Sequence, residues 1–191
     1  MVDKQIKYTI SRRRVRYPRL EFKTGNLIVV APFKFEISPL IEKHRNWILN
    51  KTEFINNTLK EIKKEKLIKR DRETVESLIK RLIKESEEIL KVKPRKIYFR
   101  LMKTKWASCS KKKNLTLNPL LGHLPEDLIR YVIFHEFCHL VVPRHNKKFW
   151  FLISRKFNNS EQLERKLFGY WFLLWQAKSR GIKREIQLWL K

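Results

Sequence analysis

One segment, His-Glu-Phe-Cys-His at residues 135–139, restricts the possible folds of this chain more than any other feature of its sequence. It lies within a stretch from Pro125 to Pro143 whose apolar residues fall on nearly every side of a helix, so the helix that it predicts is a buried one. Two imidazoles and a carboxylate are costly to bury unless another group binds them. The fold must therefore surround this helix and still supply partners for its polar side chains.

The spacing of these polar residues suits a metal ion. On a helix of about 3.6 residues per turn, His135 and His139 lie roughly 40° apart and point to the same side. Their nitrogens can meet one Zn²⁺ ion at roughly 2.0–2.1 Å. Glu136 lies roughly 100° round the helix from His135, where it can take a proton from a water molecule that the metal activates. We therefore expect one zinc ion, with Glu136 as the catalytic base.

A catalytic zinc site needs a third protein ligand and keeps one position open. His145 is the preferred third ligand, because Pro143 ends the helix and allows the chain to turn back toward the metal. A carboxylate from the following helices, Glu161 or Glu164, is the alternative. Histidine is preferred because it is the commonest metal ligand in proteins.

The remaining hydrophobic patterns predict an α+β fold. Strands are expected within residues 5–31, with a turn at 24–26, and at 97–99 and 115–118, and a basic loop is expected at 103–113. Helices are expected at about 38–56, 71–92, 125–143, 146–157 and 160–178, and the aromatic residues of 168–175 are expected to pack in the core. We divide the chain into a β-hairpin and helix subdomain at 1–60, a domain carrying the metal site at 61–178 and a C-terminal extension at 179–191.

The chain carries 45 Lys and Arg residues against 19 Asp and Glu residues, a formal net charge of +26. Such a charge attracts polyanions, and nucleic acid is the commonest polyanion in a cell. A solvated basic surface is an equally good interpretation. The candidate nucleic-acid-binding residues are Arg12, Arg13, Arg14, Arg16, Lys111, Lys112 and Lys113.

Composition also bears on the compartment. No apolar run reaches the roughly 18 residues of a membrane span, and no apolar signal segment is visible near Met1, so we expect a cytoplasmic protein without a membrane partner. Cys109 and Cys138 are too few for a disulfide framework. We expect both to be free thiols that serve in packing.

Several motifs, in order along the chain, carry a resemblance to a known family. They are W-A-S-C-S at residues 106–110, L-T-L-N at 115–118, the segment 131–140 with H-E-x-x-H, and H-N-K-K-F-W at 145–150. Together they resemble the YgjP-like metal-dependent hydrolases, relatives of the SprT-like zincins. The resemblance implies a zincin-like metallopeptidase core with His135, His139 and His145 as metal ligands and Glu136 as the catalytic acid and base. Ala107 stands where the family usually has glycine.

In zincin-like folds an edge strand beside the active-site helix can bind an extended substrate as an added strand. The segment 115–118 is the expected strand, with Leu115, Leu117 and Asn118 as substrate-binding residues. An ordinary edge strand is an equally good interpretation of the same pattern.

The expected activity is that of a zinc-dependent metallopeptidase, in which an activated water attacks a peptide carbonyl with Glu136 as general base. Analogy with SprT-like relatives makes protein bound to nucleic acid a candidate substrate. One alternative is a metal-dependent pyrophosphatase of nucleoside triphosphates such as UTP, whose phosphates would suit the basic charge. The other is a nucleic-acid-binding module with structural zinc, against which Glu136 argues, because a closed structural site needs four ligands.

Overall fold

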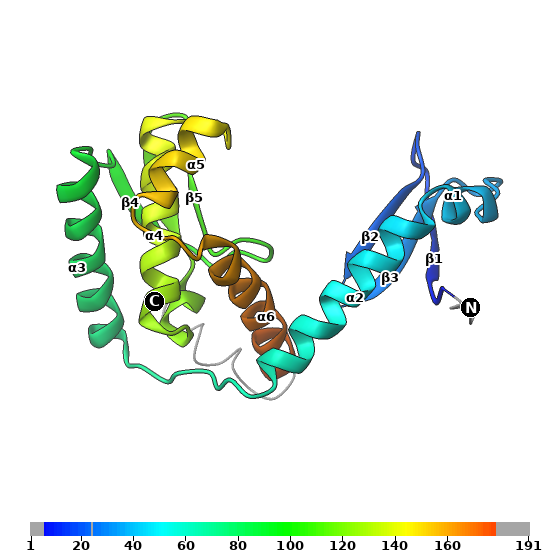
Figure 1. Cartoon of the computed structure of the whole chain (residues 1–191), viewed down its shortest axis with the longest axis horizontal. Helices are drawn as coiled ribbons and strands as arrows, with labels where there is room; N and C mark the ends of the chain where they lie inside the picture. The colour runs from blue at the N-terminus through cyan, green and yellow to red at the C-terminus, as the bar shows by residue number, and fades with distance from the viewer. Residues whose placement is uncertain (1–5, 24, 179–191) are drawn as a thin grey trace. The chain divides into compact units, whose positions relative to one another are not determined.

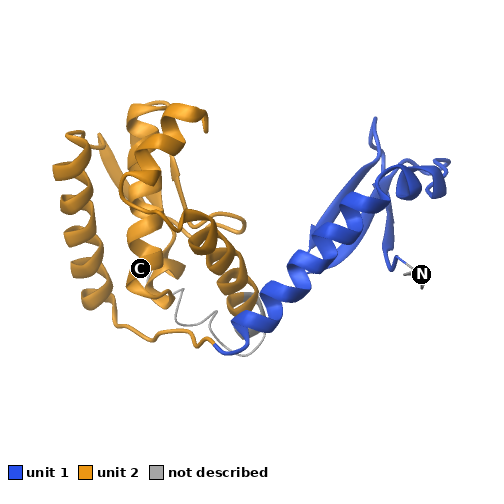
Figure 2. Ribbon diagram, in the orientation of Figure 1, with its two compact units in different colours: residues 1–64 blue, residues 65–191 orange. Residues whose placement is uncertain are grey.

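A computed structural model describes residues 6–23 and 25–178 of the chain, with side chains as far as residue 174. The chain divides into two compact units, residues 1–64 and 65–191 (Figure 2). The mixed α+β class is confirmed, and the division lies close to the predicted boundary after residue 60. The predicted extension at 179–191 lies outside the described residues. No helix in the described ranges is long and apolar enough to cross a membrane.

The first unit is a three-stranded sheet with two helices (Figure 1). Its elements are β1 (Thr9–Arg12), β2 (Arg19–Lys23), β3 (Asn26–Ala31), α1 (Ser38–Lys43) and α2 (Arg45–Ile62). The antiparallel hairpin of β2 and β3 turns at Gly25, whose φ of 85° suits glycine. β1 lies parallel to β3 on its other side, so the predicted hairpin gains a third strand. The single helix expected at 38–56 is interrupted at His44, where α1 ends and α2 begins.

The core of the first unit lies between β3 and the helices. Leu27 and Val29 of β3 pack with Ile41 and Ile48 of the helices, and all four are almost fully buried. This separate core allows the unit to be compact by itself.

The second unit places a small sheet beside one central helix. Its elements are α3 (Arg72–Leu90), β4 (Lys96–Phe99), β5 (Ala107–Cys109), β6 (Asn114–Leu117), the 3₁₀ turn η1 (Pro119–His123), α4 (Glu126–Val141), α5 (Lys147–Ser154) and α6 (Ser160–Lys178). The strand order is β4-β6-β5, with β6 parallel to β4 and antiparallel to β5. The loop expected at 103–113 therefore contains a strand, β5. Ala107 lies in that strand without a positive φ, so its methyl group needs no strained backbone.

α4 is the predicted buried helix. It lies between α3 and α6 in Figure 1 and also contacts β5 and α5. Ile129, Ile133 and Phe137 along it are fully buried, which accounts for its apolar character on nearly every side. Cys138 is also fully buried, as expected of a packing residue. The other elements of the unit therefore enclose the helix that carries the H-E-x-x-H motif.

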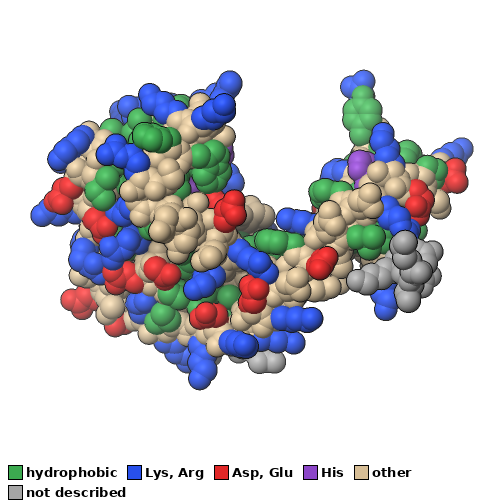
Figure 3. All heavy atoms as spheres, in the orientation of Figure 1, with side chains coloured by type: hydrophobic (Ala, Val, Ile, Leu, Met, Phe, Trp, Pro, Cys, Tyr) green, Lys and Arg blue, Asp and Glu red, His purple; other side chains and the backbone are tan. Residues whose placement is uncertain are grey.

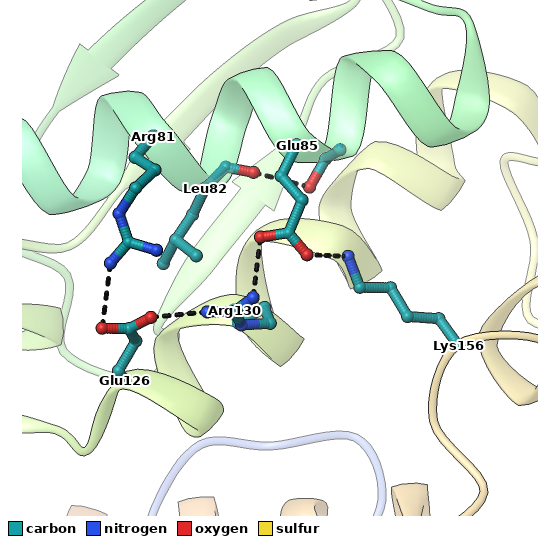
Figure 4. Close-up of polar contacts among 7 residues, drawn as sticks. Arg81, Leu82, Glu85, Glu126, Arg130 and Lys156 are labelled. Atoms are coloured by element: carbon teal, nitrogen blue, oxygen red, sulfur yellow. Dashed lines mark hydrogen bonds and ion pairs between the residues drawn. The ribbon is translucent and has the colours of Figure 1, made fainter.

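A chain of ion pairs fixes α3 against α4 (Figure 4). Glu85 of α3 accepts from Arg130 Nη1 of α4 at 2.8 Å and from Lys156 Nζ at 2.5 Å. Glu126, in the first turn of α4, pairs with Arg130 and with Arg81 of α3. These charges alternate in sign, and all except the exposed Arg81 are partly buried, so the network orients the two helices more firmly than isolated surface pairs would.

Candidate metal centre

Three histidines of the second unit meet at one place. His135 and His139 come from successive turns of α4, and His145 comes from the turn that follows it. One ring nitrogen from each lies within 4.8 Å of the other two, and the Nε2 atoms of His135 and His145 are 3.0 Å apart. Nitrogens on a tetrahedral zinc ion at roughly 2.0–2.1 Å lie about 3.3 Å from each other. Small ring rotations would therefore bring this donor set to an ion, and the residues fit a zinc site.

The orientation of His139 is set by a backbone group. Its Nδ1 lies 3.2 Å from the carbonyl oxygen of Val142, the residue that ends α4. A carbonyl oxygen only accepts hydrogen bonds, so Nδ1 is the protonated nitrogen and Nε2 keeps its lone pair. This is the usual way in which the second nitrogen of a ligating histidine is fixed.

A buried aromatic ring supports all three imidazoles. Phe149 of α5 is fully buried, and its ring centroid lies 4.9 Å from that of His135, 4.7 Å from His139 and 4.5 Å from His145. The first turn of α5 is fixed in turn by Asn146, whose Oδ1 accepts a hydrogen bond from the Phe149 backbone N–H. The helix cap and the ring together limit how far the imidazoles can move.

Burial favours the neutral form of the two imidazoles on α4. Burial, followed by the charges of His139 and His145, lowers the pKa of His135 to about 3. Burial also lowers the pKa of His139, although the Val142 carbonyl acts in the opposite direction. Neutral imidazoles have free lone pairs, so these rings need not lose a proton before they bind a metal.

Glu136 lies next to this cluster and is almost fully buried. The pKa of its carboxyl group is raised to about 7, mainly by burial. A backbone hydrogen bond from Cys109 and the charge of Lys105 act in the opposite direction and lower this pKa. Cys109 is the last residue of β5, so the edge strand directly contacts the carboxylate that the motif supplies. A carboxyl group with a pKa near neutral pH can both accept and return a proton.

The cluster opens into a cleft of about 980 Å³ within the second unit. One wall is the segment 104–111, which includes β5, and the floor is α4 with the turn at 143–145. The opposite wall is α6, through Glu164, Leu167, Phe168 and Trp171. Glu136 and the three histidines all line this cleft, so a ligand in it can reach every member of the candidate centre.

Comparison with protein families identifies the domain. The model of the YgjP-like metallopeptidase domain matches residues 52–169. The chain belongs to the YgjP-like metallopeptidase family. It is accordingly a metal-dependent hydrolase of the peptidase type. A comparison with curated proteins found no match.

Two solved structures are similar to part of this YgjP-like chain. The metallopeptidase zymogen abylysin of Pyrococcus abyssi is 23% identical, with a TM-score of 0.43 over 47% of this chain and 90% of the other. The metallopeptidase zymogen jannalysin of Methanocaldococcus jannaschii is 29% identical, with a TM-score of 0.45 over 53% of this chain and 93% of the other.

The structure separates the two candidates for the third ligand of the YgjP-like centre. His145 joins His135 and His139, whereas Glu161 and Glu164 are not part of the cluster. Glu164 instead accepts a hydrogen bond of 2.8 Å from the buried hydroxyl of Tyr131. Burial, and then this hydrogen bond, raise the pKa of Tyr131, so the phenol stays protonated.

The prediction that residues 115–118 form the edge strand that binds substrate in this YgjP-like domain is wrong. β6 is the central strand, with β4 on one side and β5 on the other, so it has no free edge. Leu115, Leu117 and Asn118 are fully buried and do not line the cleft. Asn118 donates from Nδ2 to the carbonyls of Met102 and Lys105 and so shapes the loop before β5. The edge strand at the cleft is β5, which sequence patterns missed because three residues show no periodicity.

The basic residues fall into two groups in different units. Arg12 donates to the backbone oxygens of Pro32 and Phe35 and therefore links two loops of the first unit. Arg13, Arg14 and Arg16 are exposed in the loop that follows β1, while Lys111, Lys112 and Lys113 are exposed near the end of β5 in the second unit. Figure 3 shows Lys and Arg side chains spread over the visible face of both units rather than gathered in one patch.

Proposed function

We propose that the chain is a zinc-dependent peptidase with one zinc ion held by His135, His139 and His145. The observation that carries this proposal is the meeting of three imidazoles with the buried Glu136 carboxylate in one cleft. Three protein ligands leave one coordination position for water or substrate, as in catalytic zinc sites. A bound zinc ion would act as a Lewis acid, polarising the scissile carbonyl and lowering the pKa of a water molecule.

Glu136 performs the proton transfers in this proposal. As a carboxylate it takes a proton from the attacking water onto a side-chain oxygen, and it then gives that proton to the nitrogen of the leaving amine. The backbone N–H of Cys109 and the charge of Lys105 favour the ionised form, whereas burial favours the protonated form. This balance near neutral pH supports both halves of the cycle.

The free edge of β5 is the proposed binding site for the substrate backbone. The Trp106 carbonyl accepts from the N–H of Asn118, just after β6, and the Ser110 N–H donates to Asn114 of β6, so alternation along the strand points the backbone groups of Ala107 and Cys109 away from β6. The Cys109 N–H donates to Glu136, so the backbone groups of Ala107 are the ones that would pair with an extended peptide. This assignment replaces the one that the sequence pattern gave to residues 115–118.

The main test measures zinc content and turnover together. Glu136→Gln is expected to retain zinc and to lose at least about a hundredfold of the activity on an unfolded protein substrate. His145→Ala is expected to lose zinc, whereas Glu164→Ala, a change in the same cleft, is expected to keep it. Full activity of Glu136→Gln would contradict the proposal, and so would unchanged zinc binding by His145→Ala.

Two other functions remain to be compared with this one. Four cations in the cleft favour a nucleoside triphosphate as a second candidate substrate, so UTP is assayed beside the protein substrate. Turnover of UTP alone would favour the pyrophosphatase.

Nucleic-acid binding through Arg13, Arg14 and Arg16 is a separate proposal. It is tested by the salt dependence of oligonucleotide binding before and after these residues are changed to Ala.

A further inference from the structure

The charges that line the cleft are unbalanced. Its basic residues are Lys105, Lys111, Lys113 and Arg144, and its acidic residues are Glu136 and Glu164. The four basic side chains are exposed, and none forms an ion pair within the part of the chain that the structure describes. Two of them lie close to the proposed reacting groups, since the charge of Lys105 acts on Glu136 and Arg144 directly precedes His145 in the chain.

The two carboxylates of the cleft form no ion pair with these cations among the described residues, and the cations outnumber them. Glu136 is buried against β5 and accepts from the Cys109 N–H, and Glu164 accepts from Tyr131. The lining of the cleft therefore carries four cations against two carboxylates, a local excess of positive charge.

The side of the cleft formed by α6 is apolar, in contrast to the basic side described above. Trp106 and Trp171 meet edge to face with ring centroids 4.7 Å apart, and Leu167 and Phe168 continue this apolar wall. Leu167 is buried, whereas the three aromatic rings are half-buried and accessible from the cleft. A large apolar side chain that covered them would remove apolar surface from water.

We infer that the cleft selects peptide segments that carry Asp or Glu beside the scissile bond together with a large apolar residue. This inference rests on the proposed peptidase function and names its substrate class. The exposed cations attract carboxylates and disfavour Lys and Arg, the apolar wall takes the apolar side chain, and the edge of β5 takes the backbone. A nucleoside triphosphate would use the cations but would leave the edge of β5 unpaired, so the observations favour the peptide.

The test uses short fluorescent peptides that are identical except for the residues flanking a central Leu, which are Asp, Ser or Lys. Turnover by the zinc-loaded chain gives kcat/KM, and fluorescence anisotropy with Glu136→Gln gives the affinity without cleavage. The Asp peptide is expected to exceed the Lys peptide by about tenfold or more in both measurements at low salt, because the cations of the cleft attract the carboxylates of one peptide and repel the ammonium groups of the other. High salt is expected to reduce this difference.

Reversing the charge of cleft residues tests whether the preference for the Asp peptide arises in the cleft. Lys111→Glu combined with Arg144→Glu is expected to reverse the order of the Asp and Lys peptides. The matched control is Lys80→Glu combined with Lys84→Glu, which makes the same change of charge on exposed positions of α3 outside the cleft. The control is expected to keep the original order.

The outcomes separate the inference from the function on which it rests. If all three peptides are cleaved equally, the selectivity is wrong while the peptidase stands. If none is cleaved, the peptidase proposal fails, and the affinities for Glu136→Gln still decide whether the cleft prefers carboxylates. Displacement of the Asp peptide by UTP at concentrations far below the peptide's own Kd would overturn the inference in favour of a nucleotide.

Discussion

Phe149 supports the three histidine rings, and its removal tests whether that contact sets the affinity for the metal. The side chain is fully buried and lies within 4.9 Å, centroid to centroid, of each imidazole. Phe149→Ala leaves a cavity beneath the rings. Phe137 of α4 is the matched control, because it is equally buried and has no ring contact with a histidine in the described part of the chain.

The two substitutions are expected to have similar effects on stability and different effects on the metal. Truncation of a buried Phe to Ala costs about 3–5 kcal/mol from lost transfer energy and the residual cavity. Both metal-free variants should therefore lose roughly this much free energy of unfolding. Only Phe149→Ala frees the imidazoles to rotate, and loss of a group that orients ligands typically weakens metal binding by about 10–100-fold.

Urea unfolding of the metal-free proteins and competition for zinc with a chelator measure the two effects separately. Phe149→Leu and Phe137→Leu keep more of the volume and extend the comparison if the Ala variants do not fold. Equal zinc affinity of the Phe149 and Phe137 variants, at equal loss of stability, would refute the idea that the ring positions the ligands.

Three further predictions concern stability and are each measured by chemical unfolding. Asn118→Ala should cost about 2–3 kcal/mol, because it leaves the carbonyls of Met102 and Lys105, the first of them buried, without their donor. Its activity should also fall, because the loop before β5 forms part of the cleft wall. Gly122→Ala should cost about 1–3 kcal/mol, because the new methyl group would lie 2.9 Å from a methyl group of Val75. Glu85→Gln should cost about 1 kcal/mol of stability. Burial raises the pKa of Glu85, but the hydrogen bond and charge of Lys156 outweigh burial, so the net pKa is lowered. The stability that Glu85 contributes is therefore present above the ordinary pKa of 4.5 and disappears as the pH falls through the lower pKa of the folded state.

The helices of the second unit could be predicted from the sequence, because helix caps and apolar spacing are local features of the chain. α3 begins after Asp71, whose side chain accepts from the Thr74 N–H, and its apolar positions recur at helical spacing as far as Leu90. α4 ends at Val141, just before Pro143, and the chain then turns so that His145 joins the histidine cluster, as the sequence predicted.

The sheet that forms the cleft wall could not be predicted in the same way. β5 has only three residues and lies in a Lys-rich segment that reads as a loop. The order β4-β6-β5 depends on pairings between distant segments, so the alternation in 115–118 shows a strand but not whether that strand is central. The error about Leu115 and Leu117 follows from this, since their burial on β6 depends on neighbours that the local pattern does not show.

The candidate metal centre lies on an otherwise apolar helix because groups outside α4 contact its polar side chains. The Cys109 N–H of β5 bonds to Glu136, the Val142 carbonyl bonds to His139, and the ring of Phe149 of α5 packs against the imidazoles. In the proposed mechanism, these contacts orient the Glu136 carboxylate and leave Nε2 of His139 with a free lone pair. The motif on α4 would then supply the reactive atoms, while their protonation and orientation depend on β5, the turn after α4 and α5.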